Sequence, residues 1–221
     1  MFYMHNALKY CGNILLFIIL IISTQIPILL LKILFKNENP HLILGWVLVI
    51  SSYLIIIWGV NYLIKKQTQQ AVFKPLRLSD FRFSLMMFVV LILFKGLFLQ
   101  FLSQLPTKQT FANDKAILSL VNHHSLLLMV LVIVILGPIA EELIFRGYFF
   151  SKFFKNHPWL QILISGLIFG LLHSPTNLII AVIYIVMGWI LGYTYYKRQN
   201  LSASLTTHIL NNAPFIFMLF Y

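Results

Sequence analysis

Residues 125–150 have the sequence SLLLMVLVIVILGPIAEELIFRGYFF, an apolar run that carries two adjacent carboxylates and one arginine near its end. A transmembrane helix needs about 20 mostly apolar residues to cross the hydrocarbon core of a bilayer, and this run is long enough. Polar and apolar residues do not alternate in it, so the run predicts a helix and not a strand of a membrane barrel. This stretch therefore indicates an integral membrane protein.

Apolar runs of this kind recur along the chain and predict its fold class, an all-α, polytopic membrane helical bundle. About seven transmembrane helices are expected, at Asn13–Phe35, Leu42–Ile64, Phe83–Leu102, Ser125–Phe150, Trp159–His173, Asn177–Tyr196 and Leu201–Tyr221. The fifth is short, since a helix of its length extends only about 21 Å. The first run is longer than the core of a signal peptide and lacks a convincing small-residue cleavage site, so we interpret it as a span.

The composition excludes several other classes of protein. Of the 221 residues, 60% are hydrophobic and only 10% are charged, which is far below the usual charge of soluble domains. The net charge of +11 comes from lysines and arginines scattered in short connections, without the aromatic and basic surface of a nucleic-acid-binding protein. The single cysteine, Cys11, can form neither an internal disulfide nor a cysteine metal site. The expected partner is the lipid bilayer, with no nucleic acid.

The basic residues predict the orientation of the chain in the membrane. With seven spans, eleven of the sixteen fall on the side of the N-terminus: Lys9, Lys65, Lys66, Lys74, Arg77, Arg82, Arg146, Lys152, Lys155, Lys197 and Arg198. Positive charges collect on the cytoplasmic side of membrane proteins. We therefore expect a cytoplasmic N-terminus and, with an odd number of spans, an external C-terminus.

Two of the five acidic residues lie where a membrane protein rarely tolerates them. Glu141 and Glu142 follow an unbroken apolar stretch, and a buried ionisable group in a membrane costs several kcal/mol. These two carboxylates therefore need a partner or a function. The other three acidic residues are expected in connections: Glu38, Asp80 and Asp114.

Arg146 supplies a partner for one of the two carboxylates. Glu142 and Arg146 are four residues apart, in the favourable order for an ion pair on a helix, whereas Glu141 points about 100° away. Glu141 is left without that counter-charge and becomes the candidate reactive carboxylate. Pro138, which precedes it, removes a backbone donor and frees the carbonyl of Val134. The alternative is a charge cluster at the cytoplasmic end of the helix, solvated by lipid headgroups.

Two histidines and one asparagine complete the candidate polar residues. His173 ends one predicted span, and His208 and Asn212 are four residues apart on another, so the last two share a helix face. Each histidine could equally make a plain interhelical hydrogen bond. Together with Glu141, these side chains could line a polar cavity suited to hydrolysis, with the carboxylate as general base towards water. The remaining histidines, expected in tails or loops, are given no role: His5, His41, His123, His124 and His157.

Three short motifs resemble those of a known family. They are Glu-Glu-x-x-x-Arg at residues 141–146, Phe-x-x-x-His at 169–173 and His-x-x-x-Asn at 208–212. In this order, on successive predicted helices, they resemble the CPBP family, the CAAX-protease and bacteriocin-processing family of intramembrane peptidases, also called the Abi family. The resemblance covers approximately residues 125–214. It makes residues 125–221 the expected catalytic helical core and leaves 1–124 as transmembrane spans and loops without a recognised motif.

The resemblance implies an intramembrane endopeptidase that hydrolyses a peptide bond of a membrane-associated substrate, in the plasma membrane of a bacterium. The residues that it implies to be catalytic are Glu141, Glu142, Arg146, His173, His208 and Asn212. In this reading Glu141 activates the attacking water and His173 holds that water. His208 and Asn212 stabilise the oxyanion, and the remaining pair orients the site.

The use of a metal is open at the level of sequence. Glu141, His173 and His208 would make a plausible three-ligand zinc set with one open position. No helix, however, carries the His-Glu-x-x-His pattern of zinc peptidases. We expect a metal-free glutamate mechanism without a cofactor, with zinc as the alternative.

Other functions compete with the peptidase interpretation. The motifs of site-2 metalloproteases, rhomboids and presenilin-like enzymes are absent from the sequence. The main alternative is a bacteriocin self-immunity protein of the same family, with or without required peptidase activity. A small transporter or channel would leave Glu141, His173, His208 and Asn212 unexplained as a set.

Overall fold

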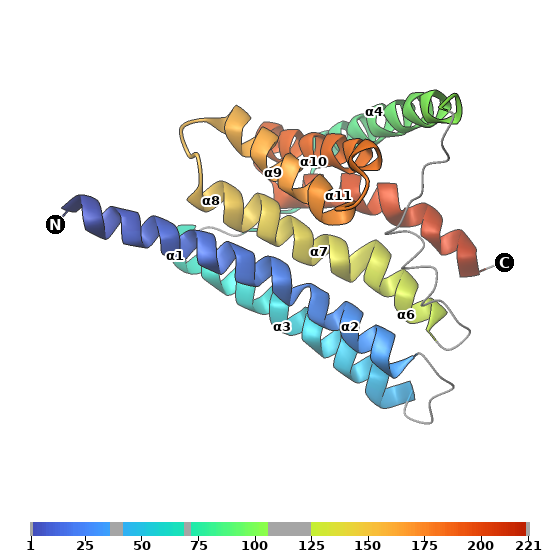
Figure 1. Cartoon of the computed structure of the whole chain (residues 1–221), viewed down its shortest axis with the longest axis horizontal. Coiled ribbons are helices and arrows are strands. Elements are labelled where there is room, and N and C mark those ends of the chain that lie inside the picture. Colours follow the sequence, from blue (N-terminus) through green and yellow to red (C-terminus); the bar gives the residue numbers. More distant parts are fainter. Residues whose placement is uncertain (1, 36–41, 69–71, 106–124, 220–221) are drawn as a thin grey trace.

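The computed structural model of the chain describes residues 2–35, 42–68, 72–105 and 125–219 (Figure 1). Every regular element in these ranges is a helix. Some residues discussed above lie outside the described part, namely Glu38, His41, Asp114, His123, His124 and the side chain of His5.

Five helices of the described chain are long and apolar enough to cross a membrane. They are Leu8–Leu34, Leu42–Thr68, Leu78–Ser103, Leu126–Lys152 and Leu178–Arg198. The most apolar parts of the first three are only 22%, 22% and 11% buried in the protein, against 61% for the fourth, which is therefore the central helix of the bundle. The predicted all-α, polytopic membrane helical bundle is confirmed, and the chain is a multi-pass membrane protein.

The fifth and seventh predicted spans are shorter than these five. The fifth is α9, Pro158–His173, with 16 residues. The seventh is α11, Leu201–Asn212, with 12 residues, followed by a 3-10 helix, η3, Ala213–Leu219. Pro214 has no amide hydrogen with which to continue the α-helical pattern, and this explains the change of winding.

The first span is divided at Thr24 into two helices. These are α1, Phe2–Ser23, and α2, Gln25–Leu34. Pro27 has no amide hydrogen, so one of the backbone hydrogen bonds that would continue α1 into α2 is missing. Both helices pack on α3, Leu42–Thr68.

The central helix changes its winding along its length. It consists of α6, Leu126–Leu131; the π-helical η1, Val132–Leu136; α7, Gly137–Glu142; the π-helical η2, Leu143–Phe149; and α8, Phe150–Lys152. In η1 the amide of Gly137 donates to the carbonyl of Val132, five residues back. The two carboxylates at residues 141–142 thus lie on a short α-helical segment between two π-helical ones. Short π-helical segments are frequent at functional sites.

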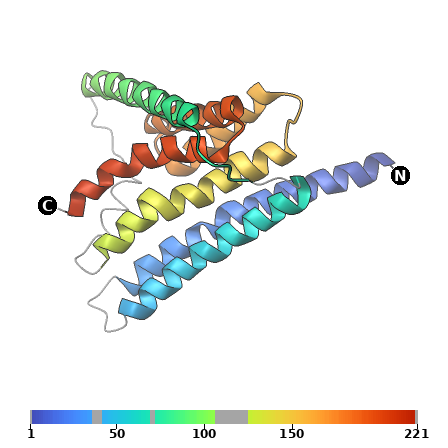
Figure 2. The same cartoon turned by 180° about the vertical axis from the view of Figure 1, so that it is seen from behind.

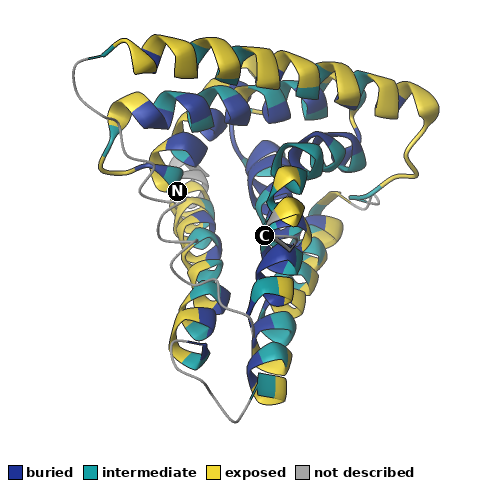
Figure 3. Cartoon of the chain, turned by 90° about the vertical axis from the view of Figure 1, so that its right-hand side faces the viewer, coloured by how far each residue is buried: buried dark blue, intermediate teal, exposed yellow. Residues whose placement is uncertain are grey.

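Two groups of helices cover opposite sides of the central helix (Figures 1 and 2). The group of α1, α2 and α3 lies on one side, where α1 and α3 contact η2. On the other side, α9 and α11 contact the central helix, and α10, Leu178–Arg198, packs on both of them. The last helix, α4, Leu78–Ser103, covers α10 and α11 from outside. Exposed residues lie on the outer faces and buried residues on the covered ones (Figure 3).

Asp80 was expected in a connection, and this expectation is wrong. Asp80 lies in the first turn of α4 and is buried. Its Oδ1 accepts a hydrogen bond from Nε of Arg198 at 2.7 Å, and its Oδ2 accepts one from Asn200 at 3.3 Å. A buried carboxylate is tolerated when it is paired and hydrogen-bonded. The positive end of the helix dipole, at the N-terminus of α4, also stabilises the negative charge of Asp80. Because Arg198 ends α10 and Asn200 is the N-cap of α11, Asp80 fastens the start of α4 to the junction of these two helices.

Glycines allow α9 and α10 to approach each other closely. A Cβ on Gly188 would lie 2.6 Å from the Cα of Gly166, and one on Gly170 would lie 2.5 Å from the amide nitrogen of Ile185. Gly166 and Gly170 have the small-xxx-small spacing typical of close helix pairs in membranes. This tight pair fixes the end of α9, where His173 lies.

The variant Gly188→Ala is expected to destabilise the protein, because its methyl group would overlap the backbone of α9. Overpacking of this kind costs about 1–3 kcal/mol. The measurement is the free energy of unfolding in detergent. Gly96→Ala is the matched control, since a Cβ at Gly96 meets no heavy atom within 4 Å. Equal stability of Gly188→Ala and the wild type would contradict the close contact.

Candidate active site

Side chains from three helices meet at Glu141. Glu141 lies on α7, His173 is the last residue of α9, and His208 lies on α11. The Oε1 atom of Glu141 is 3.9 Å from Nε2 of His173, and its Oε2 atom is 3.7 Å from Nε2 of His208. These distances are too long for good direct hydrogen bonds, but a water molecule or substrate atom beside each pair can contact both members. The structure thus brings together the carboxylate and both histidines that the sequence singled out.

The ring of His173 is held in one orientation. Its Nδ1 is 2.8 Å from the carbonyl oxygen of Phe169. Because a carbonyl only accepts, Nδ1 carries the hydrogen, and the neutral ring keeps a lone pair on Nε2, which faces Glu141. The ring also stacks on Phe169 and on Tyr184 of α10, with centroid distances of 4.2 and 5.1 Å. The side chains of His173 and Glu141 remain 23% and 27% exposed, so water can reach them.

Glu142 joins Arg146 to His208 in a buried network. Its Oε1 atom is 3.0 Å from Nη1 of Arg146 and 3.0 Å from Nδ1 of His208. Arg146 also donates through Nη2 to the carbonyl of Gly188 at 2.9 Å. The side chains of Glu142 and Arg146 are 0% exposed, so they do not form the headgroup-solvated cluster considered as the alternative. With Nδ1 held by Glu142, the other ring nitrogen of His208 faces Glu141.

Phe169, the first residue of the second motif, packs against three members of the site. Its buried ring lies 4.2 Å from the ring of His173 and meets that of His208 edge-on at 5.9 Å, between centroids. The Cζ atom of Arg146 lies 5.2 Å from the centroid of the same ring. An aromatic face attracts a cation and excludes water from it. Phe169 therefore orients both imidazoles and shields the guanidinium.

Asn212 is directed at the backbone of the central helix. Its Nδ2 donates to the carbonyl of Ile133 at 2.9 Å, and its Oδ1 accepts from Asn211 at 2.8 Å. The sequence predicted that Pro138 frees the carbonyl of Val134, as it would in an α-helix. In the π-helical η1 each amide reaches one residue further back, so the missing donor falls at Ile133 instead. Asn212 supplies that donor, and its expected contact with an oxyanion stays a prediction.

Within the described ranges, no group of three His, Cys, Asp or Glu side chains is arranged to hold one metal ion. The zinc alternative, with Glu141, His173 and His208 as ligands, stays a prediction.

Two residues near the site were not identified from the sequence. Tyr53 of α3 is buried, and its hydroxyl oxygen lies 3.9 Å from the position that a Cβ would occupy on Gly137, one helical turn before Glu141. Lys95 of α4 donates to the side chain of Asn211. An isolated tyrosine in an apolar helix has no spacing pattern that identifies it. For Lys95 a signal existed, because an ionisable residue inside a predicted span indicates a functional role.

The fold and the site define a class of protein, a multi-pass membrane protein whose bundle encloses a carboxylate between two histidines. Residues 123–214 match the family described as Type II CAAX prenyl endopeptidase Rce1-like. This match confirms the resemblance predicted from the three motifs, and it covers the whole site.

Curated relatives agree with this family match. The chain is 30% identical over 107 residues to YdiL of Bacillus subtilis (strain 168), named as a candidate membrane peptidase, and the match covers 48% of this chain and 42% of that protein. It is 33% identical over 78 residues to the UPF0177 protein YbdI of Lactococcus lactis subsp. lactis (strain IL1403), covering 35% of this chain and 41% of YbdI. The chain thus spans less than half the length of these relatives. No solved structure is significantly similar to it.

Proposed function

We propose that the chain is an intramembrane endopeptidase that hydrolyses a peptide bond of a membrane-associated substrate through a water molecule activated by Glu141. The observation that carries the proposal is the placement of the Glu141 carboxylate 3.9 Å and 3.7 Å from the Nε2 atoms of His173 and His208. The match to a family of CAAX endopeptidases and the name of the Bacillus relative support a peptidase.

In this proposal Glu141 is the general base. As the water oxygen bonds to the peptide carbonyl carbon, one water proton passes to Glu141 and the carbonyl π electrons move to the carbonyl oxygen. His173 accepts the second water hydrogen at Nε2 and so fixes the water. His208, held at Nδ1 by Glu142, donates from a protonated Nε2 to the oxyanion. The proton on Glu141 then moves to the leaving nitrogen as the C–N bond breaks.

Hydrolysis is tested directly with labelled water. The purified protein, reconstituted in lipid vesicles, is incubated with membrane-anchored peptides in water that carries the heavy oxygen isotope. Mass spectrometry should find shortened peptides with one heavy oxygen atom in the new carboxyl terminus. Folded wild-type protein that binds these peptides and leaves all of them intact would count against the proposal.

Metal removal separates the glutamate mechanism from the zinc alternative. If Glu141 activates water without a metal, we expect purified protein to hold far less than one zinc per chain and to keep its activity in a strong chelator. A zinc enzyme would lose its metal to the chelator and recover on addition of zinc. Elemental analysis and the cleavage assay check both points. One tightly bound zinc per chain, required for activity, would make Glu141, His173 and His208 ligands.

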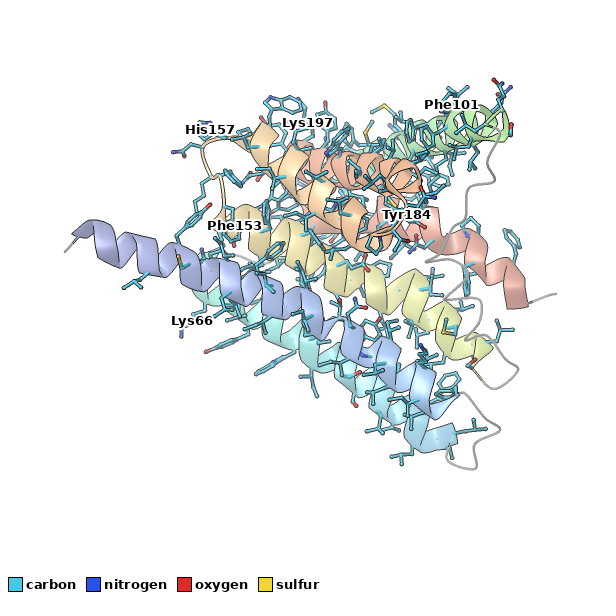
Figure 4. The ribbon with its side chains drawn as sticks, viewed as in Figure 1. Lys66, Phe101, Phe153, His157, Tyr184 and Lys197 are labelled. Atoms are coloured by element: carbon cyan, nitrogen blue, oxygen red, sulfur yellow. The ribbon has the colours of Figure 1, made fainter. Side chains whose placement is uncertain are left out.

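The orientation with a cytoplasmic N-terminus is tested by cysteine labelling. Lys66 and Phe101 lie at opposite ends of the molecule, and Lys66 shares its end with Phe153 and His157 (Figure 4). In a Cys11→Ser background, Lys66→Cys in intact cells should not react with a membrane-impermeant thiol reagent. Ser103→Cys, two residues after Phe101 and also exposed, should react. The opposite pattern would reverse the orientation.

A further inference from the structure

Tyr53 lies beside the face of α7 that carries Glu141. Its hydroxyl oxygen is 3.9 Å from the position that a Cβ would occupy on Gly137. Gly137 and Glu141 are four residues apart on α7, so they share one face of that helix. Side chains on a helix lean towards its N-terminus, which directs the Glu141 carboxylate towards the level of Gly137. The absence of a side chain at Gly137 leaves space for the phenol.

The phenol ring of Tyr53 is held rigidly. The residue is only 3% exposed, and its ring belongs to an apolar cluster with Val49 of the same helix and Leu128 and Met129 of the central helix. A group held by packing keeps its position when substrate binds, which is what a preorganised donor requires. Tyr53 is thus a fixed contribution of the N-terminal helices to the surroundings of Glu141.

The hydroxyl of Tyr53 makes no hydrogen bond within the described part of the chain, although buried tyrosine hydroxyls usually have a partner. It lies near the backbone of Gly137, one helical turn before Glu141, and no hydrogen bond joins it to the Glu141 carboxylate in the described residues. The hydroxyl is therefore a donor next to the proposed base whose hydrogen is not used by the protein.

We propose that Tyr53 is a further catalytic residue, whose hydroxyl donates a hydrogen bond to the carbonyl oxygen of the scissile peptide as that oxygen becomes an anion. The proposal rests on the peptidase function proposed above. A neutral phenol is a good donor and carries no charge that would repel the Glu141 carboxylate. The tyrosine proton stays on its oxygen throughout, while the water proton goes to Glu141 and then to the leaving nitrogen.

The other groups that could donate a hydrogen bond to the oxyanion are Asn212 and His208. One hydrogen of the Asn212 side-chain amide, which is expected to stabilise the oxyanion, is donated to the carbonyl of Ile133, so Nδ2 has at most one hydrogen left for the substrate. His208 supplies one donor to the oxyanion, from Nε2, because its Nδ1 is held by Glu142. Oxyanion sites use several donors, tyrosine hydroxyls among them, and Tyr53 supplies one from the N-terminal helices.

The test compares Tyr53→Phe, which removes only the hydroxyl, with Tyr62→Phe on the same helix, where the ring is 52% exposed and stacks on Trp58. For Tyr53→Phe we expect kcat to fall by a factor of about 100–1,000, the usual cost of one oxyanion donor, with KM nearly unchanged. The acid limb of the pH profile of kcat/KM should stay in place, since the base is untouched. Tyr62→Phe should match the wild type. Unchanged kcat in Tyr53→Phe overturns the proposal.

A binding measurement separates this proposal from the peptidase function and from a folding defect. A phosphonamidate peptide, which mimics the tetrahedral anion, should bind Tyr53→Phe more weakly than wild type by about the factor lost in kcat, while the parent amide peptide binds both equally. Wild type that neither cleaves the parent peptide nor prefers its phosphonamidate would remove the peptidase function itself. If wild type cleaves the parent peptide and prefers its phosphonamidate, and Tyr53→Phe shows the same preference, only the proposed role of Tyr53 is refuted. Equal weakening for both peptides would mean that the phenol is merely structural.

Discussion

Replacing Arg146 with methionine is expected to lower the free energy of unfolding by about 3–5 kcal/mol, the usual cost of removing one partner from a buried ion pair. Arg146 and Glu142 are both 0% exposed and 3.0 Å apart, so the variant would leave a carboxylate inside the bundle without its cation. It would also leave the carbonyl of Gly188 without the donor from Nη2. Denaturant or thermal unfolding in detergent measures the loss.

A double variant identifies the cause of this loss. Replacing a whole buried ion pair with apolar residues is often close to neutral for stability. Arg146→Met combined with Glu142→Leu should therefore be more stable than Arg146→Met alone, although it lacks the contact that orients His208. Lys155→Met, at an exposed lysine before α9, is the control and should change stability by less than about 0.5 kcal/mol. A single variant as stable as the wild type would refute the buried pair.

The parts of the site that the sequence predicted are those governed by local geometry. Glu142 and Arg146 are one helical turn apart, so their ion pair follows from helix periodicity. The bond between Glu142 and His208 joins residues 66 positions apart, and only the packing of α11 on α7 creates it. The placement of Glu141 between two imidazoles was expected from the family resemblance, and no local rule supplies it.

Hydropathy predicted the membrane-spanning helices of the fold, whereas the helical winding and the helix ends were harder to predict. The five helices long enough to cross a membrane each overlap an apolar run found in the sequence. The π-helical winding of η1, which moves the unpaired carbonyl from Val134 to Ile133, has no sequence signal besides Pro138. The sequence predicted that the third span begins at Phe83, whereas α4 begins at Leu78. Hydropathy treats Asp80 as polar, and its burial depends on the hydrogen bond from Arg198, which hydropathy does not include.

Glu141→Gln is expected to lower the rate of peptide cleavage by a factor of about one hundred or more, the contribution of a general base. The amide has the shape of the carboxylate and can form hydrogen bonds, but it cannot accept a proton from water. The buried network of Glu142, Arg146 and His208 does not include Glu141, whose contacts with the histidines are 3.7 and 3.9 Å long. The fold should therefore persist, which unfolding in detergent checks.

The division of the effect between kcat and KM shows what Glu141 does. A base acts on the water in the transition state, so Glu141→Gln should lower kcat and kcat/KM alike and leave KM nearly constant. If Glu141 only held the substrate, KM would rise and kcat would change little. Turnover of a cleavable peptide near the wild-type rate by the folded variant, in detergent micelles, would remove Glu141 from the role of base. The water would then have to be activated by another group of the site, and His173, whose Nε2 lone pair faces the same position, would be the next residue to replace.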